Sequence, residues 1–404
     1  LVGWGAHDPG VPTCAQPAEL AEEIRARFGE YCAGPWIYGF VWPSPEKASA
    51  MAEALPRAVD QRAALARWML TERFPDWDIG LVVVSEYHSA IEALWHGIDP
   101  SHPLHGLPSA QAAKAGVEAV YEAGDRLLGG LMSSFSDVAV VVFNLHGMGP
   151  NNSDNASMVL LAELMYRRAF GRPFMRQRDW PRNERGVPLL REDQVWRREI
   201  GRLFDEADPM AALAQAAKRA FGGKKTAGQP SLSWMPATRY QKFWPQMRAF
   251  ALPSFYDGRI RINLKGREAQ GLVEPSEYEA ERQACIDMLH ACRDPVTGQP
   301  AVERVEKREG DPIQARESEA DLIVIWSMAP PLGLAHDEFG VMGPLPYRRT
   351  GGHTGGPGFA YFHGPGIAAG DFGARSAFDV VPSVLELLDA GRPDQFSGTP
   401  LEFA

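Results

Sequence analysis

Three segments of this chain carry a histidine where a buried strand is expected to end, and they constrain its folding more than any other feature. They are residues 82–88, 140–149 and 349–353. The first two open with short runs of β-branched apolar residues, which are typical of strands covered on both faces. In open α/β sheets the loops at strand ends converge on one crevice. The sequence therefore predicts that His88, His146 and His353 meet at one sheet edge and form a metal site.

The composition is that of an ordinary globular protein. The 404 residues are 45% hydrophobic and 23% charged, and the length suits one large domain with an insertion, or two domains. A formal net charge of −10 argues against non-specific binding to nucleic acid or anionic membranes. No apolar run approaches the ~18 residues of a membrane span, so a cytoplasmic location is expected. Because the chain begins at Leu1 rather than Met, a removed leader or an upstream segment stays open.

Helical and strand-like segments alternate along the chain, which is the pattern of an α/β fold. We expect a central, mostly parallel sheet flanked by helices, built from residues 1–150 and 247–404. Residues 151–246 are predicted to form a helical, Arg-rich insertion, since residues 166–202 alone hold eleven arginines and five acids. These arginines form either a solvated surface or a lid that meets an anionic substrate. Expected strands cover residues 78–84, 137–143, 258–264 and 321–326, and expected helices start near residue 17 or cover residues 47–74, 109–134, 277–293 and 380–388.

The segment after the first apolar run contains a potential pair of metal ligands. If a helix starts there, His88 and Glu92 lie four residues apart and share one helical face. Such a pair can hold one divalent metal through an imidazole nitrogen and a carboxylate oxygen. His96 continues the same face but lies far down the helix. The alternative is a polar helix start with a capping residue and a surface ion pair.

The other two histidines stand among glycines. Gly147 and Gly149 follow His146 and permit positive φ or a close backbone approach. Glycines also surround His353, which is a poor place for a packing residue and a suitable one for a ligand. Taken singly, a histidine at a strand end is compatible with a structural role, and a glycine-rich segment with a plain loop. The conjunction of the three histidines favours the metal site.

Several further runs carry a family resemblance. They are Trp95–His96 with residues 99–103, residues 146–150, residues 259–268, Gly352–His353 with residues 364–367, and residues 379–388. In these motifs the chain resembles the alkaline phosphatase superfamily, and within it the type I phosphodiesterase/nucleotide pyrophosphatase branch and related phosphohydrolase or phosphomutase proteins. The likeness covers most of the chain from Leu81 on and is weakest in the Arg-rich insertion.

The resemblance implies a metal centre with altered ligands. In the family, an Asp-x-x-x-His pair and a late histidine hold one metal, and these positions fall on His88, Glu92 and His353. An early Asp, a Thr or Ser nucleophile and an Asp-His pair hold a second metal, but that pair falls on Leu145 and His146. Because leucine cannot bind a metal, we expect one site rather than two. The segment with the early Asp and the nucleophile would precede Leu1.

These expectations define a first hypothesis about function. The chain would be a metal-dependent hydrolase or transferase of phosphate or sulfate esters, with zinc or manganese on His88, Glu92 and His353. His146 and Arg349 would act in catalysis, and an arginine of this kind can pair bidentately with a phosphate or sulfate; the alternative for Arg349 is a surface loop. The expected partner is a small anionic substrate, and oligomerisation stays open.

Two alternatives belong to other classes of protein. One is a catalytically silent homologue that serves in binding or assembly, which Leu145 and the missing nucleophile support. The other is an enzyme that catalyses a non-hydrolytic step of a biosynthetic pathway.

Overall fold

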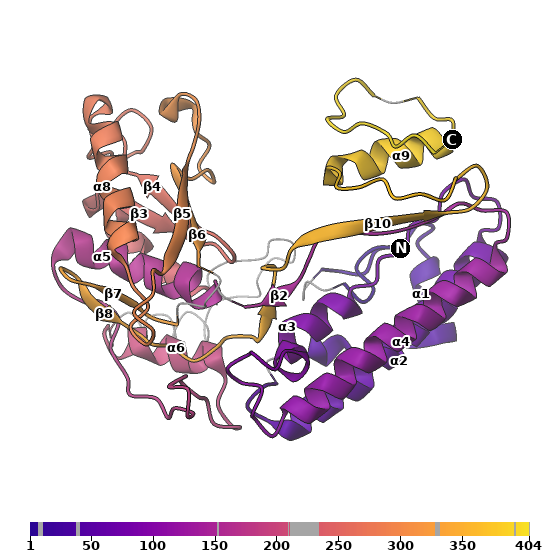
Figure 1. The fold of residues 1–404 in the computed structure, drawn as a ribbon, viewed down its shortest axis with the longest axis horizontal. Helices are drawn as coiled ribbons and strands as arrows, with labels where there is room; N and C mark the ends of the chain where they lie inside the picture. Colours follow the sequence, from indigo (N-terminus) through magenta and orange to yellow (C-terminus); the bar gives the residue numbers. More distant parts are fainter. Residues whose placement is uncertain are drawn as a thin grey trace. The chain divides into compact units, whose positions relative to one another are not determined.

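The chain folds into two compact units, each formed by segments that are distant in sequence (Figure 1). The computed structural model describes residues 1–6, 11–37, 41–151, 153–208, 210, 234–327, 332–391 and 393–403. The first unit comprises residues 1–41, 45–150 and 353–404, and the second comprises residues 42–44 and 151–352. The long N-terminal segment of the first unit ends at residue 150. The second unit groups residues 247–352 with the predicted insertion, of which residues 211–233 lie outside the described part.

Helices dominate the first unit. Its helical segments are α1 (Leu20–Phe28), η1 (Gly34–Trp36), α2 (Pro45–Trp68), the π-helical turn η2 (Met69–Arg73), α3 (Glu86–Ile98), α4 (Ala110–Ser134), η8 (Ala377–Asp379) and α9 (Val380–Leu387). The predicted helix over residues 109–134 is confirmed, and the one predicted over residues 47–74 consists of α2 and η2. Small and apolar residues recur on one face of α2, α3 and α4, as core-facing helices require. The core there includes Ala48, Met51, Leu55, Ala93, Leu94, Ala113, Val117 and Val120.

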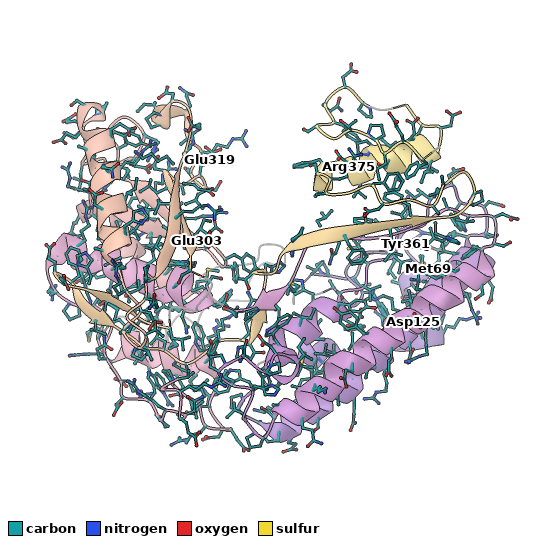
Figure 2. The ribbon with its side chains drawn as sticks, viewed as in Figure 1. Met69, Asp125, Glu303, Glu319, Tyr361 and Arg375 are labelled. Atoms are coloured by element: carbon teal, nitrogen blue, oxygen red, sulfur yellow. The ribbon has the colours of Figure 1, made fainter. Side chains whose placement is uncertain are left out.

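The strands of the first unit form a two-stranded ribbon. β1 (Val140–His146) pairs antiparallel with β10 (Pro357–His363), so that Val140 lies opposite His363 and His146 opposite Pro357. Phe359 and Tyr361 on β10 are 57% and 50% exposed, so one face of the ribbon carries exposed aromatic rings. Figure 2 labels Tyr361 on this strand. The short strand β2 (Gly149–Pro150) follows β1 directly.

The second unit is built around a four-stranded antiparallel sheet. The strands run in the order β3 (Ala249–Leu252), β4 (Gly258–Ile262), β6 (Leu322–Trp326) and β5 (Val302–Lys307). A second, two-stranded sheet pairs β7 (Leu334–His336) with β8 (Gly340–Met342), and β9 covers Gly351–Gly352. The helical segments are η3 (Ala156–Leu160), α5 (Leu161–Phe170), α6 (Trp196–Asp205), η5 (Pro236–Gln246), η6 (Pro275–Glu277), α8 (Tyr278–Ala291) and η7 (Pro312–Gln314).

The predicted central, mostly parallel sheet flanked by helices is wrong. Among the described residues the ladders β1–β10, β3–β4, β4–β6, β5–β6 and β7–β8 are all antiparallel, and the largest sheet has four strands. The predicted strand over residues 78–84 is not formed, and Leu81 and Val83 are 77% and 65% exposed. A β-branched apolar run suits a pleated strand, but it contains nothing that specifies which partner the strand takes or in which direction.

Several arginines of residues 166–202 form ion pairs within the second unit. These pairs span turns and helices: Arg167 with Glu163, Arg168 with Glu281, and both Arg178 and Arg202 with Glu199. Arg167 is buried and also donates to the carbonyls of Phe339 and Val341. Part of this Arg-rich stretch therefore ties the second unit together.

Candidate metal centre

The first two candidate ligands project from the start of α3. This helix begins at Glu86, so His88 and Glu92 lie one turn apart on the same face, as the sequence predicts. Nε2 of His88 is 2.9 Å from Oε1 of Glu92. The Glu92 side chain is only 4% exposed and that of His88 is 29% exposed. A carboxylate buried to this degree needs a cationic or hydrogen-bonding partner, so this is not an ordinary surface ion pair.

The alternative of a capping residue at this helix start is not supported by Ser85, the N-cap residue of α3. Ser85 makes no side-chain capping bond to α3, and its Oγ instead donates to the carbonyl of Gly5 at 2.7 Å. The neighbouring Glu86 is fully buried and accepts hydrogen bonds from Arg62 and Tyr31. These contacts hold the start of α3 and thereby the turn that carries His88.

His353 reaches the same place through a tight backbone approach. The amide of Gly147 donates to the carbonyl of Gly356 at 2.7 Å, and Thr354 donates to the carbonyl of Pro150. A Cβ on Gly147 would lie 2.6 Å from that Gly356 oxygen, so the close approach requires glycine there. The segment after β1 and the segment before β10 are thus joined, and His353 is placed between them.

Three side chains form one cluster that fits a metal ion. Nε2 of His353 is 3.0 Å from Nε2 of His88, and the donor atoms of His88, Glu92 and His353 all lie within 4.8 Å of one another. This is the one such group among the described residues. Tetrahedral zinc bound at about 2.0–2.1 Å holds its ligand atoms roughly 3.3 Å apart, so the spacing suits a single divalent ion. Two imidazoles and a carboxylate are also a donor set found in catalytic zinc sites.

His146 lies beside the cluster without belonging to it. Nε2 of His146 is 2.9 Å from Nδ1 of His353, which is the ring nitrogen that does not face His88. Nδ1 of His146 is 3.1 Å from the carbonyl oxygen of Gly147. The third predicted histidine is therefore brought to the site, and it contacts a candidate ligand from outside.

His96 is placed elsewhere. It lies eight residues beyond His88 on α3, roughly 12 Å along the helix axis. It is fully buried and lies 3.1 Å from Oγ of Ser109 through Nε2. Burial, together with the neighbouring His102 and His105, lowers the pKa of His96 to about 3, so this imidazole is neutral in the folded protein.

The predicted catalytic arginine is buried in the second unit. Arg349 is 2% exposed and donates to Asp154 through Nε at 2.8 Å and through Nη2 at 3.2 Å. Arg348 donates to the same carboxylate at 2.7 Å. Burial raises the pKa of Asp154 against the opposing effect of Arg348. Both arginines therefore take part in an internal ion-pair network, and the catalytic role of Arg349 stays a prediction.

One group at the site, a backbone carbonyl, could not be predicted from the sequence. The Gly147 carbonyl contacts His146, but every residue has such a carbonyl and no side-chain pattern indicates it.

No family model matches the chain, and searches for similar curated proteins and for similar solved structures found none. No helix among the described residues has the length and apolar character needed to cross a membrane.

Proposed function

We propose that this protein is a metal-dependent hydrolase or transferase of phosphate or sulfate esters, with its metal on His88, Glu92 and His353. The observation that carries the proposal is the cluster itself, in which His88 and the buried carboxylate of Glu92, both on α3, meet His353 from a distant part of the chain. Three-ligand sets of this kind leave a coordination position for water or substrate, whereas structural zinc sites are usually closed by four protein ligands.

The ester class is supported by the motifs alone. Residues 146–150 and 352–353 supply His146 and His353, and both motifs resemble those of type I phosphodiesterases. When bound, a divalent metal supplies Lewis-acid polarisation of a phosphoryl or sulfuryl oxygen. Zinc suits the two nitrogen donors best, and manganese is the second choice because of the carboxylate.

The chain's own residues have distinct parts in this proposal. Glu92, held in the interior by α3, supplies the negative charge that attracts a cation into the site. His88 and His353 supply directional nitrogen donors from α3 and from the loop before β10. The expected substrate is a small anion. Because the net charge of −10 does not attract anions over long range, such a substrate would be recognised through positive charge in the immediate surroundings of the site.

The first experiment is the metal content of the purified protein, measured by elemental mass spectrometry after incubation with zinc or manganese and removal of excess ions. We expect about one ion per chain, and less than about a tenth of that in His353→Ala, because removing one of three ligands leaves an incomplete set. His363→Ala is the matched control, since His363 is an exposed histidine on β10 outside the cluster.

Two outcomes would overturn the proposal. Full metal content in His353→Ala would show that His88, Glu92 and His353 do not form the metal site. No retained metal in the unaltered protein would favour the catalytically silent homologue. A loaded protein would then be screened with phosphate monoesters, phosphodiesters and sulfate esters, with His353→Ala as the inactive reference.

A further inference from the structure

We propose that His146 is a positioning residue that fixes the protonation pattern of His353 and is not itself a metal ligand. The effect of this inference on metal binding rests on the proposed function. The contacts of His146 themselves are present without a metal. The inference also departs from the expectation that His146 belongs to a second metal site or reacts with substrate.

A backbone carbonyl fixes which ring nitrogen of His146 carries the proton. The Gly147 oxygen lies 3.1 Å from Nδ1 of His146, and a carbonyl oxygen can only accept a hydrogen bond. Nδ1 of His146 must therefore carry the proton in this contact. A neutral imidazole has one N–H and one bare nitrogen, so Nε2 of His146 is left as an acceptor.

The next contact follows from the first. Nε2 of His146 is 2.9 Å from Nδ1 of His353, whereas the two Nδ1 atoms are 3.3 Å apart. Because Nε2 of His146 accepts, Nδ1 of His353 must be the donor. His353 then carries its proton on Nδ1, and its Nε2 keeps a lone pair.

That lone pair faces the cluster. Nε2 of His353 is 3.0 Å from Nε2 of His88, which in turn is 2.9 Å from Oε1 of Glu92. A metal-binding imidazole has to offer a bare nitrogen, and its other nitrogen usually donates to an orienting group. His353 thus donates a hydrogen bond to His146, and His146 donates one to the Gly147 carbonyl. This pattern leaves the lone pair on Nε2 of His353 directed at the metal cluster.

The ring positions argue against His146 being a further ligand of the metal cluster. His146 contacts Nδ1 of His353, while the cluster forms on the Nε2 side, so His146 approaches the ring from the edge opposite His88. The two rings are 4.4 Å apart and tilted by 55°. The antiparallel register, with His146 opposite Pro357, places His146 at the end of β1 beside the loop that carries His353.

The first test needs no metal. Histidine-labelled protein is studied by nitrogen–proton NMR at about pH 8, well above the ordinary histidine pKa of about 6.5. We expect His353 to be protonated on Nδ1, with the pattern lost in His146→Ala and kept in His146→Gln, whose amide oxygen can accept the same hydrogen bond. Protonation of His353 on Nε2 in the unaltered protein would overturn the inference.

The second test measures metal affinity with the metal ion alone. We expect His146→Ala to weaken binding 10- to 100-fold, as loss of an orienting partner typically does, and His146→Gln to restore most of it. X-ray absorption of the zinc-loaded protein should count the same number of imidazole ligands in His146→Ala as in the unaltered chain. One fewer imidazole, or an unchanged affinity, would contradict the inference.

The two tests separate this inference from the proposed function. If the unaltered protein retains no metal, the proposed metal site fails, and the NMR result alone decides the role of His146. If it binds one metal and the affinity is independent of His146, the metal site stands and the positioning role falls.

Discussion

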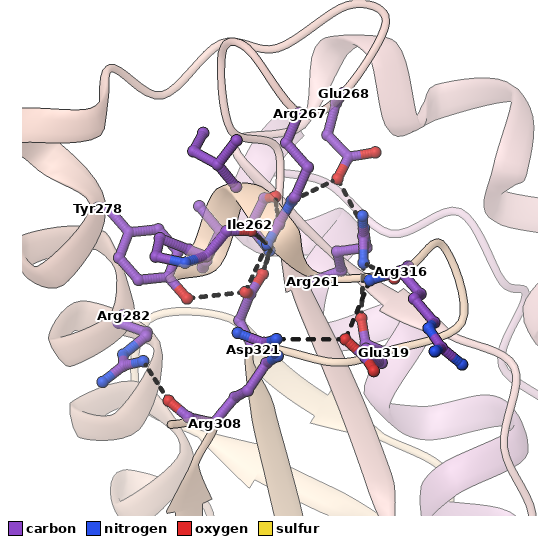
Figure 3. A network of polar contacts seen from close by, with 12 residues as sticks. Arg261, Ile262, Arg267, Glu268, Tyr278, Arg282, Arg308, Arg316, Glu319 and Asp321 are labelled. Carbon is purple, nitrogen blue, oxygen red and sulfur yellow. Dashed lines mark hydrogen bonds and ion pairs between the residues drawn. The ribbon is translucent and has the colours of Figure 1, made fainter. Parts of the chain in front are cut away.

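Asp321 lies in a network of polar contacts in the second unit, and it shows how a single buried side chain can join several segments (Figure 3). It is fully buried and accepts hydrogen bonds from Arg267, Tyr278 and the amide of Ile262. Burial alone would raise the pKa of Asp321, but these hydrogen bonds outweigh it, so the pKa lies below its ordinary value. Burial and the nearby carboxylate raise the pKa of Tyr278 to about 12, so this hydroxyl stays a donor.

We predict that Asp321→Asn strongly destabilises the protein, because it leaves the buried guanidinium of Arg267 without its full counter-charge. Loss of one partner of a buried ion pair costs about 3–5 kcal/mol of the free energy of unfolding. Tyr278→Phe removes one hydrogen bond to a charged group and should cost about 1.5–3 kcal/mol. Urea denaturation measures both variants.

The matched control is Glu303→Gln, an acid-to-amide change in an exposed pair with Arg304 on β5. Exposed ion pairs contribute about 0–1 kcal/mol, so this variant should unfold close to the unaltered protein. Equal unfolding midpoints for Asp321→Asn and Glu303→Gln would show that the buried network is not a stabilising element.

Individual ligand types could be predicted from the sequence, but their surroundings could not. The spacing of His88 and Glu92 predicts a shared helical face, because the helix geometry is local. The near-complete burial of Glu92 comes from the packing of α3 against the rest of the unit. The four-residue spacing of His88 and Glu92 carries no information about that packing. The burial of Arg349 against Asp154, at a separation of 195 residues, was equally outside any local pattern.

Among the elements, α3 and α4 pack closely against each other at Gly97. A Cβ added there would lie 2.3 Å from the amide nitrogen of Lys114 and 2.6 Å from the carbonyl oxygen of Ala110. Both are backbone atoms of α4, which cannot rotate away as a side chain could. The absence of a side chain at Gly97 therefore sets the distance between these two helices.

We predict that Gly97→Ala lowers the free energy of unfolding by about 1–3 kcal/mol, because the helices must separate to admit the methyl group. The control is Gly129→Ala on α4, where nothing lies within 4 Å of an added Cβ. That change should stabilise the helix by about 0.5–1 kcal/mol, since alanine loses less backbone entropy than glycine. Thermal unfolding of the two variants should shift in opposite directions, and a shift in the same direction would refute the packing argument.

The helices were predicted better than the strands. Apolar spacing indicated a helix over residues 109–134, and α4 covers residues 110–134, because helical contacts recur within a few residues. The run over residues 78–84 predicted a strand by the same kind of reasoning, yet it contains none. A strand requires a partner from elsewhere in the chain, and the run itself cannot supply one.

For the molecule as a whole, the two compact units contain different acid-sensitive groups. His96 belongs to the first unit and is neutral in the folded state, since its pKa is lowered to about 3. In the unfolded chain it would take up a proton below about pH 6.5. The unfolded state thus binds more protons than the folded state between these values, and the stability falls as the pH falls.

We predict that the first unit loses about 2 kcal/mol of stability between about pH 7.5 and pH 5 through His96 alone. Asp321 in the second unit behaves differently, because its lowered pKa gives stability that is lost only below about pH 3.9. The hydrogen-exchange protection factors of amides in α3 and α4, corrected for the intrinsic exchange rate at each pH, should therefore fall at mildly acidic pH before those in β4 and β6 do.

Two variants check the origin of this effect. His96→Gln removes the ionisable group and should flatten the dependence of the first unit on pH. His363→Gln changes an exposed histidine of the same unit and should leave the dependence as it is. An undiminished loss of stability in His96→Gln would exclude His96 as the cause.

The sequence alone determined the local features of this protein: the helices of the first unit and the placing of His88 one turn before Glu92. Each depends on contacts within a few residues, which spacing and residue type encode directly. Tertiary structure decided the rest, including the antiparallel pairing of β1 with β10, which brings His146 to His353 across 207 residues. Strand pairing joins distant segments, and its direction and partner depend on the packing of the whole unit rather than on the apolar run that forms the strand.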